Sequence, residues 1–425
     1  MTDVPPLPAD EPTLLVTLSG DDRPGVTSRL FTALAAHAVT VLDVEQVVVR
    51  GHLTLAVLVT AGDDPASLQR DVTREGERLG MAVSCRSGSG DNAPRRLGRL
   101  HVTVLGAPLR PEAVGAVARA IALDGGNIDR IRRISRWPVT TVEVDVSGAD
   151  VSGLRRGLSA VAAASGVDIA VSPAGLARRG RRLVVMDVDS TLIQDEVIEL
   201  IAAHAGREAQ VAAVTERAMR GELDFAESLH QRVAKLAGLP ESVLGEVRRQ
   251  VRLTPGARTL VRTLHRLGFT VALVSGGFIE IVRPLADLLG IELAEANRLE
   301  VVDGHLTGKV VGPVMDRAAK AAALRRFADA EGLPLSSTIA IGDGANDLDM
   351  IDVAGLGIAF NAKPVVQAQA DASVTVPYLD AVLYLIGIPR EEVEDADAAD
   401  PTIDVDVQDG GPSPHLPVTA GPRVT

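Results

Sequence analysis

Several residue types whose abundance would point to other classes of protein are scarce in this sequence. The single cysteine, Cys85, excludes an intrachain disulfide framework and fits a reducing compartment. Aromatic residues supply only 2% of the chain, so its core must be built from Ala, Val, Leu and Ile. No apolar run reaches transmembrane length, and the acidic, proline-rich start, expected to be flexible over 1–12, is unlike a signal peptide. These absences favour a soluble cytoplasmic protein without a membrane partner.

Basic residues are outnumbered by acidic residues, 43 to 56. The formal net charge is −13, so the chain lacks the electrostatic footprint of a nucleic-acid-binding protein. Four of the 43 basic residues are lysines, which makes each lysine, Lys320 among them, easier to weigh as a functional candidate. What the chain does have is length, since 425 residues, 46% of them hydrophobic, predict two to three folded domains.

The N-terminal part contains an internal repeat. A shift of 86 residues, the distance from Gly20 to Gly106, superimposes apolar and glycine positions without a gap. Each copy has the pattern strand, helix, two strands, helix, strand. This order predicts two ferredoxin-like βαββαβ units, at 13–90 and 98–174, each a four-stranded antiparallel sheet with both helices on one face.

The remainder, 181–390, has the pattern of a doubly wound α/β domain with a parallel sheet. Short apolar runs alternate there with helical stretches. The predicted strands are Leu183–Met186, Thr270–Val274, Thr338–Ile341, Leu356–Ala359 and Ala372–Val374. A helical block of about 197–267 is too long for a single crossover and predicts an inserted cap. The tail, 391–425, is rich in Asp, Pro and Gly, and we expect it to be disordered.

Two carboxylates, Asp187 and Asp189, directly follow the first of these strands. Ligand sites in open parallel sheets lie at the carboxyl ends of the strands. Carboxylates at i and i+2 can therefore bracket one metal ion and one phosphoryl group. The alternative is a capped helix start, because Asp, Ser and Thr also precede helices.

Three further motifs favour the phosphoryl site. The second strand runs into Ser275, Gly276 and Gly277, where a hydroxyl and glycine amides can face an oxyanion, although such a sequence alone is more often an ordinary turn. Lys320 lies near the start of a helix expected over 316–329. The alternative is that Lys320 is an ordinary exposed surface lysine. The third strand ends in a Gly-Asp-Gly turn around Asp343, which lacks the alternating oxygen ligands of a calcium loop.

In this order the four motifs resemble the haloacid dehalogenase superfamily of phosphatases, from about Leu183 to Ile386. The resemblance implies that Asp187 attacks phosphorus and forms an aspartyl-phosphate, and that Asp189 is the general acid and base. It implies a Mg²⁺ ion bound by Asp187, Asp343 and the backbone carbonyl of Asp189. It also assigns a set of residues to phosphate binding or its support: Ser275, Gly276, Gly277, Lys320, Asn346 and Asp347.

The helical block narrows the substrate. Its runs 192–196, 219–225 and 228–233 resemble the phosphoserine phosphatase family. That resemblance implies that Glu196 binds the ammonium group of O-phospho-L-serine, that Arg232 binds its carboxylate, and that Met219 and Phe225 line the cap. A zwitterionic amino acid does need one anion and one fork-shaped cation. The alternatives are a helix cap for Glu196 and a surface ion pair for Arg232, and Val188 stands where the family commonly has Phe.

The two repeats are similar to ACT domains, small modules that bind amino acids. The turn Asp22–Gly25 lies at their usual ligand loop, with Gly25 as its candidate contact and Gly106 as the counterpart in the second copy. The second copy lacks the Pro-Gly step and has Pro108–Pro111 instead. The resemblance implies a homodimer and feedback binding of L-serine, while a purely structural role for one or both copies stays open.

The expected function is therefore hydrolysis of O-phospho-L-serine to L-serine and phosphate, the last step of serine biosynthesis. One alternative is a phosphotransferase or a phosphatase for another small ester such as phosphohomoserine. Another is a serine sensor with an inactive catalytic fold, against which four intact residues argue: Asp187, Asp189, Lys320 and Asp343.

Overall fold

The structure is a computed structural model that describes residues 10–90, 99–174, 182–219 and 222–400. The chain divides into two compact units, 1–96 and 97–425, and each is described by itself. Among the described residues, no helix is both long and apolar enough to cross a membrane. The expectations for 1–9 and 401–425 lie outside the described residues.

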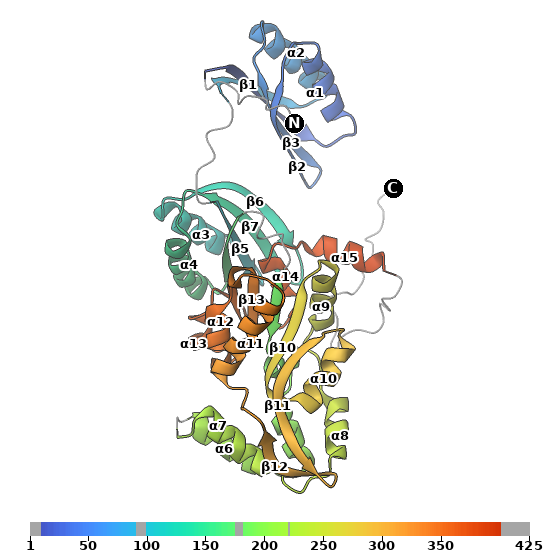
Figure 1. The fold of residues 1–425 in the computed structure, drawn as a ribbon. Helices are drawn as coiled ribbons and strands as arrows, with labels where there is room; N and C mark the ends of the chain where they lie inside the picture. The colour runs from blue at the N-terminus through green and yellow to red at the C-terminus, as the bar shows by residue number, and fades with distance from the viewer. Residues whose placement is uncertain (1–9, 91–98, 175–181, 220–221, 401–425) are drawn as a thin grey trace. The chain divides into compact units, whose positions relative to one another are not determined.

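The first unit is an antiparallel sheet with two helices against one face (Figure 1). Its elements are β1 (Pro12–Asp21), α1 (Val26–Ala35), β2 (Val41–Val49), β3 (His52–Thr60), α2 (Pro65–Arg78) and β4 (Ala82–Ser89). The strands lie in the order β2-β3-β1-β4. Alternate β1 residues, such as Leu14 and Val16, pack against Leu30 of α1 and Leu68 of α2, because successive side chains of a strand point to opposite faces. This confirms the predicted βαββαβ fold.

The second repeat has the same topology. Its elements are β5 (Leu100–Gly106), α3 (Pro111–Leu123), β6 (Asn127–Ser135), β7 (Thr140–Ser147), α4 (Val151–Ser165) and β8 (Asp168–Pro173). The strand order β6-β7-β5-β8 repeats that of the first copy. The helices cover the face that carries Val102 and Val144.

The opposite face of the second repeat packs on residues 182–400 of the same unit, the α/β part that the sequence predicts to be catalytic and that is called the catalytic part below. Leu105, Ile134 and Ala170 belong to the apolar core that also contains the central strands of 182–400. Polar contacts add to this core, since Asp168 Oδ2 accepts hydrogen bonds from the backbone N–H of Thr375 at 2.9 Å and from its hydroxyl at 3.1 Å. The second repeat and the catalytic part therefore share one core.

The catalytic part is built on a sheet with the order β12-β11-β10-β9-β13-β14-β15 in the described residues. The strands are β9 (Leu183–Met186), β10 (Thr270–Phe278), β11 (Leu293–Val302), β12 (His305–Val311), β13 (Thr338–Gly342), β14 (Leu356–Phe360) and β15 (Ala372–Val374). All five predicted strands are present and parallel. The sequence did not predict β11 or β12, which lie beside β10 in Figure 1 and end the sheet with an antiparallel pair.

Helices cover both faces of this sheet. Val184 and Met186 face one apolar core, whereas Leu183 and Val185 face the other. On the first face lie α9 (Ala257–Arg266) and α10 (Ile279–Leu288), and on the second lie α11 (Arg317–Ala330) and α12 (Leu348–Val353). This arrangement confirms the doubly wound α/β fold.

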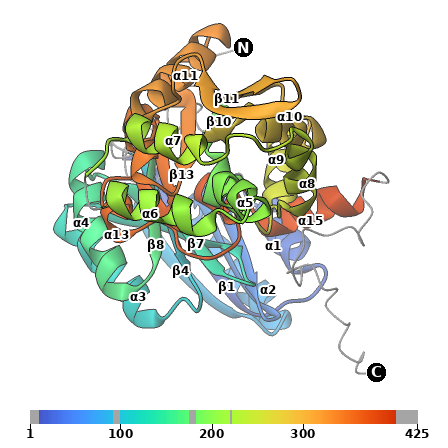
Figure 2. The same ribbon diagram turned by 90° about the horizontal axis from the view of Figure 1, so that it is seen from below.

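The helices inserted after β9 are α5 (Val197–His204), α6 (Glu208–Met219), α7 (Phe225–Ala234) and α8 (Ser242–Gln250). Helices α6 and α7 lie side by side (Figure 2). The predicted cap, 197–267, also includes α9, but α9 contacts β10 and covers the sheet. The apolar pattern of a sheet-covering helix resembles that of a cap helix, so the sequence could not separate them.

The expectation of disorder from residue 391 onward is wrong for the first part of the tail. Helix α15 (Arg390–Ala398) is ordered, and Val393 is buried in the main core. Its carboxylates pair with arginines elsewhere in the chain, because Asp397 contacts Arg262 and Arg266 at 2.5 Å each. The acidic composition that suggested disorder is thus neutralised by distant partners.

Candidate active site

A cavity of about 550 Å³ opens at the carboxyl ends of β9, β10 and β13. The predicted site residues that line it are Asp187, Asp189, Glu196, Phe225, Arg232, Gly276, Gly277, Asp343 and Asn346. Ser275 and Lys320 are fully buried and contact residues of its wall. Met219 ends α6, and its side chain lies outside the described part. The predicted residues thus converge although they come from distant parts of the sequence.

The loop after β9 directs Asp187 and Asp189 into this cavity. The backbone N–H of Asp187 donates to the Ile341 carbonyl at 2.9 Å and continues the pairing with β13. The chain then turns sharply at Ser190, whose φ of 57° lies in the left-handed region that non-glycine residues rarely adopt. From outside the loop, the buried Thr254 hydroxyl donates to the Thr191 carbonyl at 2.7 Å. This anchored turn ends the segment that carries the two carboxylates.

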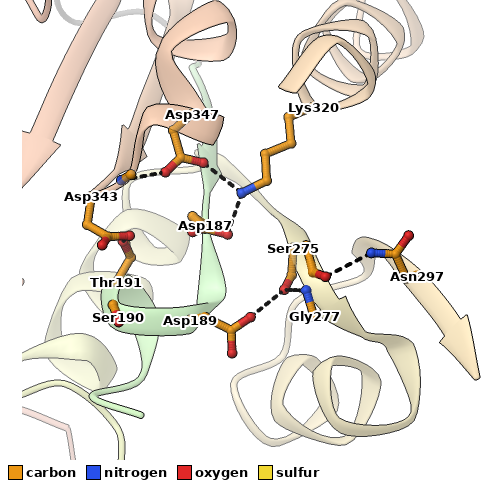
Figure 3. Close-up of polar contacts among 12 residues, drawn as sticks. Asp187, Asp189, Ser190, Thr191, Ser275, Gly277, Asn297, Lys320, Asp343 and Asp347 are labelled. Atoms are coloured by element: carbon orange, nitrogen blue, oxygen red, sulfur yellow. Dashed lines mark hydrogen bonds and ion pairs between the residues drawn. The ribbon is translucent and has the colours of Figure 1, made fainter. Parts of the chain in front are cut away.

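Lys320 forms the buried centre of the charge network (Figure 3). Its side chain is 0% exposed, and Nζ donates to Asp187 Oδ1 at 2.8 Å and to Asp347 Oδ1 at 2.7 Å. Asp316 caps helix α11 through the Ala319 N–H at 2.8 Å and so fixes the turn that carries Lys320. Burial lowers the pKa of Lys320, but Asp187 and Asp347 outweigh it and leave that pKa raised. The lysine therefore stays protonated.

Three carboxylates around this lysine leave an excess of negative charge. Oxygen atoms of Asp187, Asp343 and Asp347 lie within 4.8 Å of one another. Burial raises the pKa of Asp187 well above its ordinary value, Asp347 adds to this, and Lys320 opposes it. Burial and then Asp347 raise the pKa of Asp343 to about 6. Carboxylate oxygens are hard ligands, and a cluster of them with excess negative charge suits a divalent cation such as Mg²⁺.

Two members of this cluster, Asp187 and Asp343, belong to the metal set predicted from the sequence. Asp347 joins them in space, but its two oxygens also accept from Lys320 and from the Gly344 N–H, the latter at 3.0 Å. The backbone carbonyl of Asp189 stays a predicted ligand.

Asp189 lies between the cap and the second motif. Its Oδ1 accepts from the Val197 N–H at 3.0 Å, and its Oδ2 accepts from the Ser275 hydroxyl at 3.1 Å. Burial raises the pKa of Asp189, while these two hydrogen bonds lower it. A raised pKa favours the protonated form of the carboxyl group, which is the form that a general acid needs.

The second motif presents a hydroxyl and a backbone amide together. The Gly277 N–H donates to Ser275 Oγ at 2.8 Å (Figure 3). A Cβ at Gly276 would lie 3.0 Å from the Phe225 ring, so the glycine allows the first residue of α7 to approach. Phe225 is itself held by a capping box at the start of α7, between Asp224 and Glu227.

Opposite charges face the same cavity from the cap. Glu196 accepts from the Ser190 hydroxyl at 2.8 Å, and burial and then Asp189 raise its pKa to about 7. Arg232 of α7 makes a long hydrogen bond of 3.4 Å from Nε to the Ser228 carbonyl. Burial lowers the pKa of Arg232, with Glu196 opposing this. A carboxyl group and a guanidinium thus line the same cavity, where a zwitterion could pair with both.

Sequence reasoning missed two residues that support this site, Asn297 and Thr254. Asn297 is 1% exposed and lies on β11, a strand that was not predicted. Thr254 lies between two helices, where nothing local marks it. Only their long-range partners reveal them.

The predicted ACT-loop residues, Gly25 and Gly106, lie in the two repeats and are not among the residues that line this cavity. Gly25 precedes α1 with a φ of 98°, a conformation that favours glycine. Gly106 ends β5, where a Cβ would lie 2.9 Å from Leu109 Cα. Both are required by the backbone, and their role in ligand binding stays a prediction.

Comparison with known families matches three parts of the chain. Residues 184–352 match the haloacid dehalogenase-like hydrolases, and residues 12–86 and 100–172 each match an ACT domain.

Individual relatives extend this match to nearly the whole chain. A phosphoserine phosphatase of Streptomyces coelicolor is 59% identical over 406 residues, which cover 95% of this chain and 98% of that protein. A phosphoserine phosphatase of Mycobacterium tuberculosis is 53% identical over 392 residues, covering 91% and 96%. The structure of a probable phosphoserine phosphatase from Vibrio cholerae in its unliganded form is 34% identical with a TM-score of 0.54, and the match covers 70% of this chain and 88% of that one.

Proposed function

The chain belongs to the phosphoserine phosphatases of the haloacid dehalogenase-like hydrolase family, and we propose that it hydrolyses O-phospho-L-serine to L-serine and phosphate. The observation that carries this proposal is the pair Glu196 and Arg232, which lines the same cavity as Asp187 and Asp189. The carboxylates provide the chemistry of ester cleavage. The cap pair provides the charges that recognise the amino acid.

In the first step a carboxylate oxygen of Asp187 attacks phosphorus, and the bond from phosphorus to the serine oxygen breaks. Asp189 donates its proton to the departing alkoxide, so L-serine leaves with a neutral hydroxyl. Lys320, the Ser275 hydroxyl and the Gly277 N–H stabilise the phosphoryl oxygens as their charge redistributes. The product of this step is an aspartyl-phosphate.

In the second step a water molecule attacks the aspartyl-phosphate. Asp189, now ionised, accepts a proton from that water, and the bond between phosphorus and Asp187 breaks. Inorganic phosphate leaves, Asp187 is again a carboxylate and Asp189 is again protonated. Both steps need a buried carboxyl group with a raised pKa beside the nucleophile, as Asp189 is.

Substrate selection rests on the cap. Glu196 would pair with the ammonium group and Arg232 with the carboxylate, and Phe225 lines the same cavity. Met219 stays a predicted cap residue. Asn346 also lines the cavity and supports the phosphoryl end. A phosphate ester that lacks the zwitterion would offer neither Glu196 nor Arg232 an opposite charge inside the cavity, so its binding would lose two charge-assisted contacts.

We further propose Mg²⁺ as the cation, bound by Asp187, Asp343 and the Asp189 carbonyl. Such a cation offsets the repulsion between a carboxylate nucleophile and a phosphate dianion. Removal of metal by chelation should abolish phosphate release, and added Mg²⁺ should restore it. Undiminished release after exhaustive chelation would contradict the metal proposal alone.

The decisive test of the function is phosphate release from a panel of phosphorylated metabolites with Mg²⁺. O-phospho-L-serine should give the largest kcat/KM, and phosphohomoserine or generic esters much smaller values. Comparable values across the panel would show that the cap does not select an amino acid, which favours a broad phosphatase instead.

The nucleophile is tested by Asp187→Asn. The amide cannot attack phosphorus, so kcat should fall by a factor on the order of 10⁴ or more. Asp352→Asn, an exposed carboxylate of α12, is the matched control and should retain full activity. Phosphate release by Asp187→Asn at the control's rate would eliminate the assignment.

For the ACT repeats we propose L-serine as a regulatory ligand, with Gly25 and Gly106 at its loops, and a homodimer as the assembly. Because the second repeat shares a core with the catalytic part, calorimetry should use the full chain. Binding heat from L-serine that disappears in Gly25→Val supports the proposal. An unchanged heat in that variant would exclude Gly25, and absent heat in the parent would exclude the ligand. Ultracentrifugation tests the dimer.

A further inference from the structure

The β10–β11 pair contains an irregularity at the point where the phosphate-binding motif lies. Ser275 pairs with Ala296, but the next pair is Phe278 with Asn297. Two residues of β10, Gly276 and Gly277, therefore bulge out of the ladder opposite a step between adjacent residues of β11. A bulge leaves backbone groups without their ladder partners, and buried backbone groups need others.

The side chain of Asn297 supplies the missing partner. Its Nδ2 donates to the Gly276 carbonyl at 2.8 Å, and its Oδ1 accepts from the Met315 N–H at 2.7 Å. The amide cannot be turned over without placing a donor against the Met315 N–H and an acceptor against the Gly276 carbonyl. At 1% exposure, water cannot replace either contact, so the orientation is unique.

We propose that Asn297 is a positioning residue for phosphoryl transfer, because this amide fixes the direction of the Gly277 N–H. The carbonyl of Gly276 and the N–H of Gly277 belong to one planar peptide and point in opposite directions. Holding the carbonyl toward Asn297 turns the N–H toward Ser275 Oγ, beside the cavity that Gly277 lines (Figure 3). The oxyanion donor is thereby set before substrate arrives.

The same amide also connects the second phosphate-binding group. Met315 directly precedes Asp316, which caps α11, and the first turns of that helix carry Lys320. One side chain thus ties the Gly277 amide to the segment that positions the Lys320 ammonium. A change in their separation would misplace two donors at once, and a displacement of about 1 Å can lower a rate roughly 100-fold.

Two variants separate the contacts. Asn297→Leu has a similar volume and removes both hydrogen bonds, whereas Asn297→Asp keeps an acceptor for Met315 and loses the donor to Gly276. Both should lower kcat by about 100-fold, with KM for O-phospho-L-serine changed less than about threefold, since Glu196 and Arg232 still hold the amino acid. Asn127→Leu, at an exposed position of β6, is the control and should leave kcat unchanged.

This inference rests on the proposed phosphoryl transfer. Two further measurements therefore distinguish a failure of the inference from a failure of the proposed function. With p-nitrophenyl phosphate, which lacks the amino-acid group, the fractional loss of kcat should match that with O-phospho-L-serine. Orthovanadate, titrated by calorimetry in the presence of Mg²⁺, should bind about 100-fold more weakly to both variants, and that measurement requires no turnover of any ester.

Loss of rate and orthovanadate affinity in Asn297→Leu but not in Asn297→Asp would overturn the link through Gly276. Parental values in both folded variants would overturn the whole inference. Should either fail to show the parental unfolding transition, Asn297→Ser, which leaves room for a bridging water, replaces it under the same criteria. If the parent protein does not hydrolyse O-phospho-L-serine yet binds orthovanadate, the proposed substrate is wrong. The orthovanadate affinities of the variants would still decide the role of Asn297.

Discussion

At the scale of single residues, the site contains buried charged groups, which are costly unless groups of opposite charge lie beside them. Asp187 and Asp347 both contact the buried ammonium of Lys320, and Asp343 lies beside these two carboxylates. Burial raises the pKa of Asp187 and Asp343. Such a cluster favours ligands of both signs, because a cation can neutralise the carboxylates while the lysine meets a phosphate. The same residues therefore explain both the metal and the phosphate preference of the proposed reaction.

Gly277 has a steric role beside its donor role. A Cβ at this position would lie 2.6 Å from Asp189 Oδ2 and 3.0 Å from Ser275 Oγ, closer than real contacts allow. Gly277→Ala must therefore displace the proposed acid and base, and kcat should fall by about 100-fold or more. Steady-state kinetics with O-phospho-L-serine measure the loss.

The matched control for this prediction is Gly245→Ala in helix α8, where an added Cβ meets nothing within 4 Å. It should leave kcat unchanged and stabilise the fold by about 0.5–1 kcal/mol, because Ala restricts the unfolded chain more than Gly does. Equal kcat values in Gly277→Ala and in the parent would show that Asp189 has room to move.

At the scale of elements, the contact between β8 and the end of β15 is sensitive to pH. Burial raises the pKa of Asp168 from 3.8 to about 6, and the hydrogen bonds from Thr375 oppose this. The native state therefore holds this proton more tightly than the unfolded chain does. The resulting stabilisation is complete below pH 3.8 and is lost as the pH rises through about 6.

Replacement of Asp168 by Asn removes this titration. A shift from 3.8 to about 6 corresponds to about 3 kcal/mol, so between pH 4 and pH 7 the stability of Asp168→Asn should improve relative to the parent by up to that amount. Denaturant unfolding at a series of pH values measures the difference. A difference that stays constant over this range would contradict a raised pKa at Asp168.

At the scale of the whole molecule, the two repeats differ in their relation to the rest of the chain. The first has a core of its own, formed by residues such as Leu14 and Leu30. The second contributes Leu105, Ile134 and Val139 to the core of the catalytic part. The sequence similarity between the repeats did not reveal this contribution of the second repeat.

This difference predicts the effect of truncation. A chain of 97–425 should keep the parental kcat and unfolding midpoint, because the core that the described residues of the first repeat form lies within 1–96. A chain of 182–425 should unfold at a clearly lower temperature, since each large apolar side chain removed from the shared core costs about 1.5–3 kcal/mol. Calorimetry and steady-state kinetics on both chains provide the measurement, and equal midpoints would show that the shared core contributes little.

The residues proposed to carry out the chemistry were predictable from the sequence. Asp187 and Asp189, Ser275, Lys320 and Asp343 each adjoin a strand end or a helix start, and such local patterns are readable without a structure. The same holds for the repeat, whose period is visible in the chain. These signals are local because a strand followed by a polar turn is defined by neighbouring residues.

Only the tertiary structure decided how these residues are held. Strand β11 mixes Glu295 and Asn297 with apolar residues and carries no clear period, so its place beside β10 and the bridge from Asn297 to Gly276 were hidden. The acidic sequence of helix α15 predicted disorder, because its pairing with distant arginines cannot be read from the sequence. The core that the second repeat shares with the catalytic part was not predicted either. Each of these depends on partners far apart in the chain, which local pattern cannot specify because packing, not neighbouring sequence, brings them together.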